Sequence, residues 1–178
     1  WDGVDNQATG THDPNAATWV DRVGKVALTK SGTVTVEDDG MVFNGSSYFT
    51  RGNGTFPADS VFPWTTEVHF KVNNVSADFH VLGTNGSGGW TFLQEKGYFT
   101  FAPCHKGFTV FSGNGYVFAQ SPQLKAGDQL TATGINQKPS VQIWRDGVFS
   151  AKYEDTVATS YNHNGVSTVP FTIGTAGG

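Results

Sequence analysis

The longest regular alternation of apolar and polar residues lies between Val61 and Val72. One side carries Phe62, Trp64, Val68, Phe70 and Val72, and the other carries Thr65, Glu67, His69 and Lys71. A period of two places successive side chains on opposite faces of an extended chain. The pattern therefore predicts a strand with one buried face and one face in contact with water.

The stretch Ser140–Ser150 predicts a β-hairpin. Its first strand alternates in the same way, with Val141 and Ile143 on one face and Gln142 and Trp144 on the other. Asp146-Gly147 is a residue pair that tolerates positive φ in a two-residue turn, and Val148–Tyr153 leads the chain back. A hairpin alone is marginal in water, so its apolar face is expected to join a larger core with the apolar side of Val61–Val72.

Short apolar segments between Gly-rich and Asn-rich turns continue this strand pattern along the chain. Further strands are predicted at Val26–Leu28, Thr33–Val36, Met41–Phe43, Tyr48–Phe49, Phe79–Leu82, Gly89–Leu93, Tyr98–Phe101, Phe108–Phe111, Tyr116–Ala119, Gln129–Thr133 and Val169–Gly174. No segment has a convincing amphipathic helical pattern. We expect one all-β domain over residues 1–178, built as a two-sheet antiparallel sandwich or jelly roll.

Composition supports strands and excludes several partner classes. The chain has 23 Gly, one Met and 13% aromatic residues, which favours strands and turns over helices. Its formal charge is −4 and it has no Lys/Arg cluster, which argues against nucleic acid and anionic membranes as partners. No apolar run approaches the roughly 18 residues of a membrane span, so no membrane insertion is expected.

Five motifs, taken in order, resemble the landmarks of a laminin-G-like domain of the concanavalin A-like lectin/glucanase superfamily. They are Trp19-x-Asp21-x-x-Gly24, Gly40–Gly45, Trp64–Lys71, Val141–Phe149 and Phe171–Gly174. The opening Trp1–Asn6, followed by a Thr-rich loop, is similar to a bacterial and phage subset found in surface and virion structural proteins. Family members usually continue with a strand at each end, so the resemblance implies that this chain is a fragment of a larger polypeptide.

This resemblance implies a concanavalin A-like jelly roll and an extracellular, cell-surface or virion location. Two functions remain open. The first is a non-catalytic, lectin-like adhesion module that binds a glycan or polysaccharide. The second is a purely structural or decorative module that contacts neighbouring domains or subunits and takes no small ligand.

Sugar binding requires an exposed aromatic ring beside fixed amide and hydroxyl groups, because a pyranose has an apolar face and a polar rim. Trp144, beside Gln142 on the face opposite Val141, is the first candidate platform. Trp90 and Tyr98 are the next candidates. Burial of both faces of a strand would remove any of them from the list.

The sequence raises two further chemistries, and the first is calcium binding. Asp2, Asp5 and Asp21 offer carboxylates within one loop, and Ca²⁺ takes six to eight oxygen ligands. Laminin-G-like relatives often hold one structural calcium, but no ligand spacing here matches such a site residue by residue. Calcium is thus one hypothesis, and carboxylates that cap turns are the other.

Hydrolysis is the second, and the sequence predicts no enzyme. Glucanases of the same superfamily set paired carboxylates on one strand face in a Glu-x-Asp-x-x-Glu pattern. The nearest stretch is Glu37–Val42, where Val42 stands in place of the second Glu. Glu67 and His69 share a strand face, and a solvated polar row is the more frequent role of such a pair.

Overall fold

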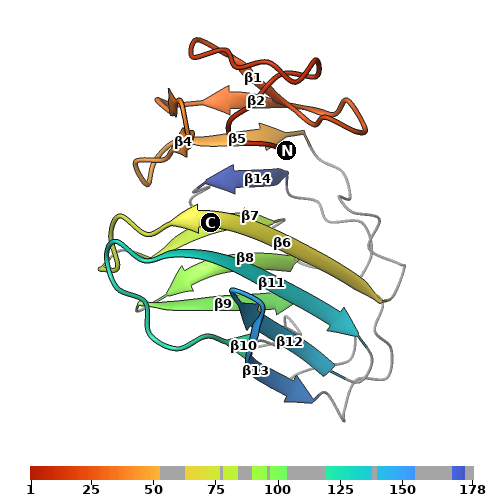
Figure 1. The fold of residues 1–178 in the computed structure, drawn as a ribbon, viewed down its shortest axis with the longest axis vertical. Coiled ribbons are helices and arrows are strands. Elements are labelled where there is room, and N and C mark those ends of the chain that lie inside the picture. The colour runs from red at the N-terminus through yellow and green to blue at the C-terminus, as the bar shows by residue number, and fades with distance from the viewer. Residues whose placement is uncertain are drawn as a thin grey trace.

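The computed structural model describes residues 1–52, 63–76, 78–83, 90–95, 97–103, 119–137, 140–154 and 170–174 (Figure 1). The side chains of Trp64, Phe79 and Glu95 are not described, and the predicted residue Phe62 and strands Phe108–Phe111 and most of Tyr116–Ala119 lie outside these ranges. The regular structure of the described residues is entirely β. Within them, no helix has the length and apolar character needed to cross a bilayer.

The described strands form two main sheets and one small hairpin. Their bounds are β1 Thr18–Val20, β2 Ala27–Ser31, β3 Thr35–Glu37, β4 Gly40–Val42, β5 Tyr48–Arg51, β6 Trp64–Lys71, β7 Phe79–Gly83, β8 Trp90–Glu95, β9 Tyr98–Pro103, β10 Ala119–Gln120, β11 Gln129–Gln137, β12 Ser140–Arg145, β13 Val148–Glu154 and β14 Phe171–Gly174. The larger sheet has the order β1-β2-β5-β14-β7-β8-β9-β10, and the smaller has the order β13-β12-β11-β6. The β3–β4 pair stands apart.

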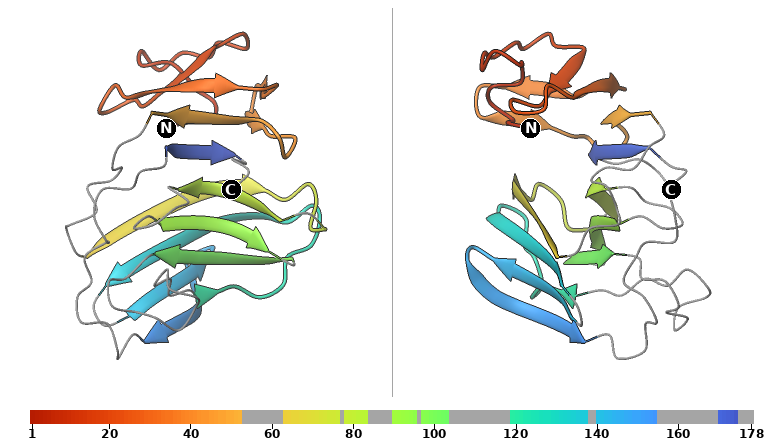
Figure 2. Two further views of the ribbon diagram at one scale, coloured as in Figure 1. Left: turned by 180° about the vertical axis from the view of Figure 1, so that it is seen from behind. Right: turned by 90° about the vertical axis from the view of Figure 1, so that its right-hand side faces the viewer.

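The two sheets face each other as a sandwich, with β9 and β10 lying against β12 and β13 (Figure 2). The described strand pairs are antiparallel, as a sequence of consecutive short strands and tight turns favours. The larger sheet extends beyond β6, where β1, β2 and β5 continue it (Figure 1). The prediction of an all-β sandwich is therefore confirmed.

The alternation in β6 and β12 is as predicted. In β6, Thr65, Glu67, His69 and Lys71 are exposed. Val68 and Phe70 pack against the core on the other side. In β12, Val141 and Ile143 are fully buried, whereas Gln142 and Trp144 are half-buried on the outer face. The two segments share one core even though some 70 residues separate them in the sequence.

The β12–β13 turn has the predicted backbone. Asp146 has φ 52° and Gly147 has φ 74°, and Arg145 pairs directly with Val148 across the two-residue turn. Left-handed conformations at both central positions match the twist of the flanking strands. The Asp146 backbone N–H donates to Thr131 O at 2.8 Å, and Asp146 Oδ1 accepts from Thr131 N at 2.7 Å. The turn is thereby tied to β11 as well as to its own two strands.

A cluster of phenylalanine rings fills the space between the sheets. Phe92 stacks on Phe99 with centroids 4.9 Å apart, and Phe99 reaches Phe70 of the opposite sheet at 4.8 Å. Gly134 of β11 faces this cluster. A Cβ built at Gly134 would lie 2.7 Å from ring carbons of both Phe92 and Phe101. The rings therefore pack directly on the backbone of β11.

The segment 1–26 is ordered by side chains that reach its backbone. Trp1 Nε1 donates to the carbonyls of Trp19 and Val26, each at 3.2 Å, and Trp19 Nε1 donates to Asp2 O at 2.7 Å. The fully buried Asn6 side chain donates to Asp13 O at 2.8 Å and accepts from Asp13 N at 2.9 Å. The short strand β1 inside this segment was not predicted, because three residues carry too little pattern to be distinguished from a loop.

The packing at Gly134 yields a stability test. Gly134→Ala is expected to lower the free energy of unfolding by about 1–3 kcal/mol, because the new methyl group would force two rigid rings to move. Gly52→Ala is the matched control, since a Cβ at Gly52 meets nothing within 4 Å. Chemical denaturation of both variants measures the difference, and equal midpoints would contradict the packing described.

Candidate functional site

The outer face of the smaller sheet carries one row of side chains that crosses all four strands. Glu67 of β6 pairs with Thr133 of β11, Thr133 with Trp144 of β12, and Trp144 with Phe149 of β13. Directly paired residues in a sheet point to the same face. We call these four residues the aromatic row. Three strand spacings separate its ends, which is about 14 Å.

Trp144 and Phe149 form an aromatic corner at one end of the row. Their ring centroids lie 5.5 Å apart and their planes make an angle of 79°. Phe149 is 49% exposed and Trp144 is half-buried. Trp144 Nε1 donates to Gln142 Oε1 at 3.1 Å, and Gln142 Nε2 donates to Ser140 Oγ at 3.3 Å. This chain of hydrogen bonds fixes the orientation of the indole.

The other end of the row is polar and exposed. Thr133 Oγ1 donates to Glu67 Oε2 at 3.2 Å, and His69 Nε2 lies 3.8 Å from Glu67 Oε1. The Thr131 hydroxyl lies 2.7 Å from His69 Nδ1. Hydroxyl, carboxylate and imidazole groups thus stand beside the aromatic corner on a single sheet face.

The predicted platform Trp90 is not on the surface. It is 2% exposed, and its ring packs against Phe171 with centroids 6.2 Å apart. The expectation that Trp90 offers an open ring face is corrected, because β8 is buried on both of its faces: Thr91, its neighbour on the opposite side, is also only 2% exposed. Trp90 is a core residue in this structure.

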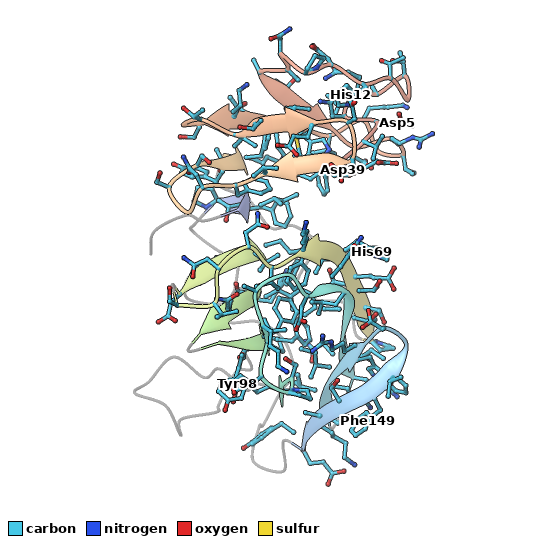
Figure 3. The ribbon with its side chains drawn as sticks, turned by 60° about the vertical axis from the view of Figure 1, so that its left-hand side comes forward. Asp5, His12, Asp39, His69, Tyr98 and Phe149 are labelled. Carbon is cyan, nitrogen blue, oxygen red and sulfur yellow. The ribbon has the colours of Figure 1, made fainter. Side chains whose placement is uncertain are left out.

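Tyr98 is half-buried and lies on the other sheet, in β9. Its neighbour Phe99 points inward to Phe92 and Phe70, so Tyr98 points outward, away from the smaller sheet. Figure 3 shows Tyr98 at one side of the molecule and His69 and Phe149 at the other. Of the four predicted sugar-binding residues, the structure brings together Trp144 and Gln142 only.

Phe149 and Thr133 belong to the site and were not predicted as site residues. Phe149 could have been found, because a two-residue turn at Asp146-Gly147 sets Trp144 opposite Phe149 in the hairpin. Thr133 could not, since its place beside Trp144 depends on the pairing of β11 with β12. The residues that connect β11 to β12 do not specify that pairing.

The carboxylates predicted to bind calcium have protein partners. Arg22 Nη1 bridges Asp2 Oδ2 at 3.2 Å and Asp5 Oδ2 at 3.3 Å. Asp2 Oδ1 accepts from Val4 N at 3.0 Å, and the carboxylate of Asp21 accepts from the backbone N–H groups of Val23 and Gly24. Figure 3 shows Asp5 in this N-terminal part of the molecule.

In the structure these three carboxylates are engaged by Arg22 and by backbone N–H groups. Among the described residues, no group of three or more His, Cys, Asp or Glu side chains is placed to hold a metal ion. Arg22 supplies the positive charge that offsets repulsion between Asp2 and Asp5. Calcium binding here stays a prediction from the sequence, and the role of Asp21 in capping a turn accounts for its geometry.

Comparisons with known proteins support the fold alone. The structure is similar to the crystal structure of the receptor binding domain of botulinum neurotoxin D, with a TM-score of 0.53 and 6% sequence identity. The match covers 87% of this chain and 43% of that one, so this chain spans less than half of that domain. No protein-family model and no curated protein matches the sequence.

Arg22 is expected to stabilise the N-terminal segment by a small amount. Because the groups are exposed, Arg22→Gln should lower the free energy of unfolding by no more than about 1 kcal/mol, and the loss should shrink at high salt. Arg51→Gln, at an exposed position on β5, is the control. A second comparison melts the wild-type protein in calcium and then in chelator. A melting midpoint that is higher in calcium than in chelator would favour the predicted calcium ion, and not Arg22 alone, as the group that neutralises Asp2 and Asp5.

Asp2 is expected to make the fold acid-sensitive. Hydrogen bonds from the backbone N–H of Val4 first, then from Asp5 and Arg22, hold the pKa of Asp2 below its ordinary value of 3.8. The unfolded state then binds a proton at higher pH than the folded state, so this stabilisation is complete above pH 3.8 and is lost as the pH falls through the folded pKa. Asp2→Asn should therefore flatten the acid limb of a stability profile, whereas Asp39→Asn in the exposed β3–β4 turn should leave it unchanged.

Proposed function

We propose that this chain is a non-catalytic carbohydrate-binding module of an extracellular, cell-surface or virion protein, and that the aromatic row is its binding site. The observation that carries the proposal is the aromatic corner of Trp144 and Phe149 beside Thr133 and Glu67 on one sheet face. Proteins recognise sugars with aromatic rings that lie beside polar side chains. The apolar C–H face of the sugar stacks on the aromatic ring, while its hydroxyls form hydrogen bonds with the polar side chains.

Three further observations support this proposal. The indole of Trp144 is oriented by Gln142 before any ligand arrives, which lowers the entropy lost on binding. The chain folds as an all-β sandwich, which is the coarse architecture of the laminin-G-like domains that the ordered sequence motifs resemble. A fold neighbour named as a receptor binding domain is compatible with a recognition role for this architecture.

A structural module remains the second candidate, and one observation favours it. Val148 is 68% exposed and Phe149 is 49% exposed on β13, the outermost described strand at one side of the smaller sheet. Apolar side chains at a sheet edge are suited to contact with a neighbouring subunit or domain. Under this alternative, Val148→Asp would reduce self-association or assembly, and no glycan would bind.

A glycan array on the purified protein tests the first proposal. Trp144→Ala should weaken binding at least about tenfold, since loss of ring stacking and buried area costs on the order of 1.4 kcal/mol or more. Tyr98→Ala is the matched control, because it removes a half-buried aromatic side chain from the other sheet. Equal binding by both variants would show that the aromatic row is not the site.

No glycoside hydrolysis is expected. The aromatic row contains one carboxylate, Glu67, whereas retaining and inverting glycosidases generally use two that flank the scissile bond. Incubation with β-glucans should release no reducing sugar. Release that disappears in Glu67→Gln but persists in Glu37→Gln, at an exposed glutamate of β3, would overturn the non-catalytic assignment.

A further inference from the structure

We infer that the aromatic row binds a neutral polysaccharide chain laid across the strands, with one sugar ring at the Trp144–Phe149 corner and the next ring over Thr133 and Glu67. This inference rests on the proposed function. It adds a direction, a minimum length and a charge preference for the ligand.

The direction of the bound sugar chain follows from the order of the residues in the aromatic row. Its apolar groups lie on β12 and on the outermost described strand β13, and its polar groups lie on β11 and β6. A ring stacked at the corner therefore has Phe149 on one side and Thr133 on the other. A chain that continues toward β6 meets hydrogen-bonding groups at each strand, whereas past Phe149 the described residues add no further strand to this sheet.

The length follows from the strand spacing. The row extends for about 14 Å across three strand spacings, which is longer than a single pyranose ring. A monosaccharide at the corner would leave the Glu67 carboxylate, two strand spacings from Trp144, beyond its reach. The site is thus matched to at least two linked rings, and the second ring should add affinity.

Hydrogen-bonding capacity at the second position is still available. Thr133 Oγ1 donates its proton to Glu67 Oε2, so the oxygen lone pairs of Thr133 remain free to accept from a sugar hydroxyl. An ionised carboxylate accepts several hydrogen bonds, and Glu67 side-chain atoms are 56% exposed. Gln142, in contrast, is engaged with Trp144 and Ser140 and acts as a positioning residue for the indole.

The charge preference comes from Glu67. A uronic acid at the second position would bring its carboxylate beside the Glu67 carboxylate, and like charges at contact distance disfavour binding. The lysines on this face lie to either side: Lys71 follows Glu67 along β6, and Lys152 is paired with Glu154 at 2.6 Å. A chain of uncharged sugars meets no such penalty.

Calorimetric titration with saccharide series of increasing length tests the inference. The probes are glucose oligomers linked β-1,3 or β-1,4 and mannose oligomers, from monosaccharide to tetrasaccharide, with oligogalacturonates as the acidic series. The proteins are the wild type, Trp144→Ala, Thr133→Val and Glu67→Gln. Thr29→Val and Glu37→Gln, at exposed strand positions outside the smaller sheet, are matched controls.

We expect affinity for a neutral series to rise from monosaccharide to disaccharide or trisaccharide and then level off. Glu67→Gln should lower the affinity for the longer oligomers about threefold to tenfold while leaving monosaccharide affinity unchanged, in line with the loss of one hydrogen bond. Thr133→Val should lower the affinity for the longer oligomers by a similar factor. Glu67→Gln should also improve binding of the oligogalacturonates. Trp144→Ala should weaken binding at least about tenfold at every length, and the two controls should behave as wild type.

The outcomes separate this inference from the function on which it rests. Binding that depends on Trp144 but does not change with chain length, or is unaffected by Thr133→Val and Glu67→Gln, would overturn the chain orientation and leave the sugar-binding role in place. Stronger binding of the acidic series by the wild type would overturn the charge preference. If none of the series binds, the proposed function fails and this inference fails with it.

Discussion

The direct packing of two phenylalanine rings on the backbone of Gly134 sets the spacing of the sandwich. Phe92 and Phe101 come from the larger sheet, and Gly134 belongs to β11, an inner strand of the smaller one. No side chain intervenes at this point, so the rings fix the distance of β11 from the larger sheet. Because β6 and β12 both pair with β11, this contact contributes to the placement of the whole outer face.

Because successive residues of a strand point to opposite faces, the inward packing of β11 also determines which residues lie on the outer face. Gly134 faces inward, so its neighbour Thr133 faces outward into the aromatic row, and the same holds for Ile143 and Trp144 in β12. The two-residue turn sets Phe149 opposite Trp144, and a bulge between the Ile143 and Trp144 pairings then shifts the register so that Ala151 lies opposite Ile143. The Trp144–Phe149 corner at the surface thus depends on the inward packing of β11 and β12 and on the tight turn between β12 and β13.

The sequence predicted local structure well and long-range pairing poorly. The faces of β6 and β12 and the turn at Asp146-Gly147 follow from period-two patterns and backbone preferences, which act over a few residues. The pairing of Thr133 with Glu67 joins residues 66 positions apart, and only the closed sandwich determines it. Trp90 was misplaced for a related reason, since burial of both faces of β8 depends on what covers the sheet and not on the pattern within the strand.

The separation of the aromatic row from the core has an evolutionary consequence. Glu67, Thr133, Trp144 and Phe149 lie on the face that the phenylalanine cluster does not use, so replacing them alters no core contact. Surface substitutions away from such packing usually change stability by little. Residues on this face can therefore be substituted to bind a new ligand while the fold is retained. Related chains are expected to diverge first along this row and last at Gly134.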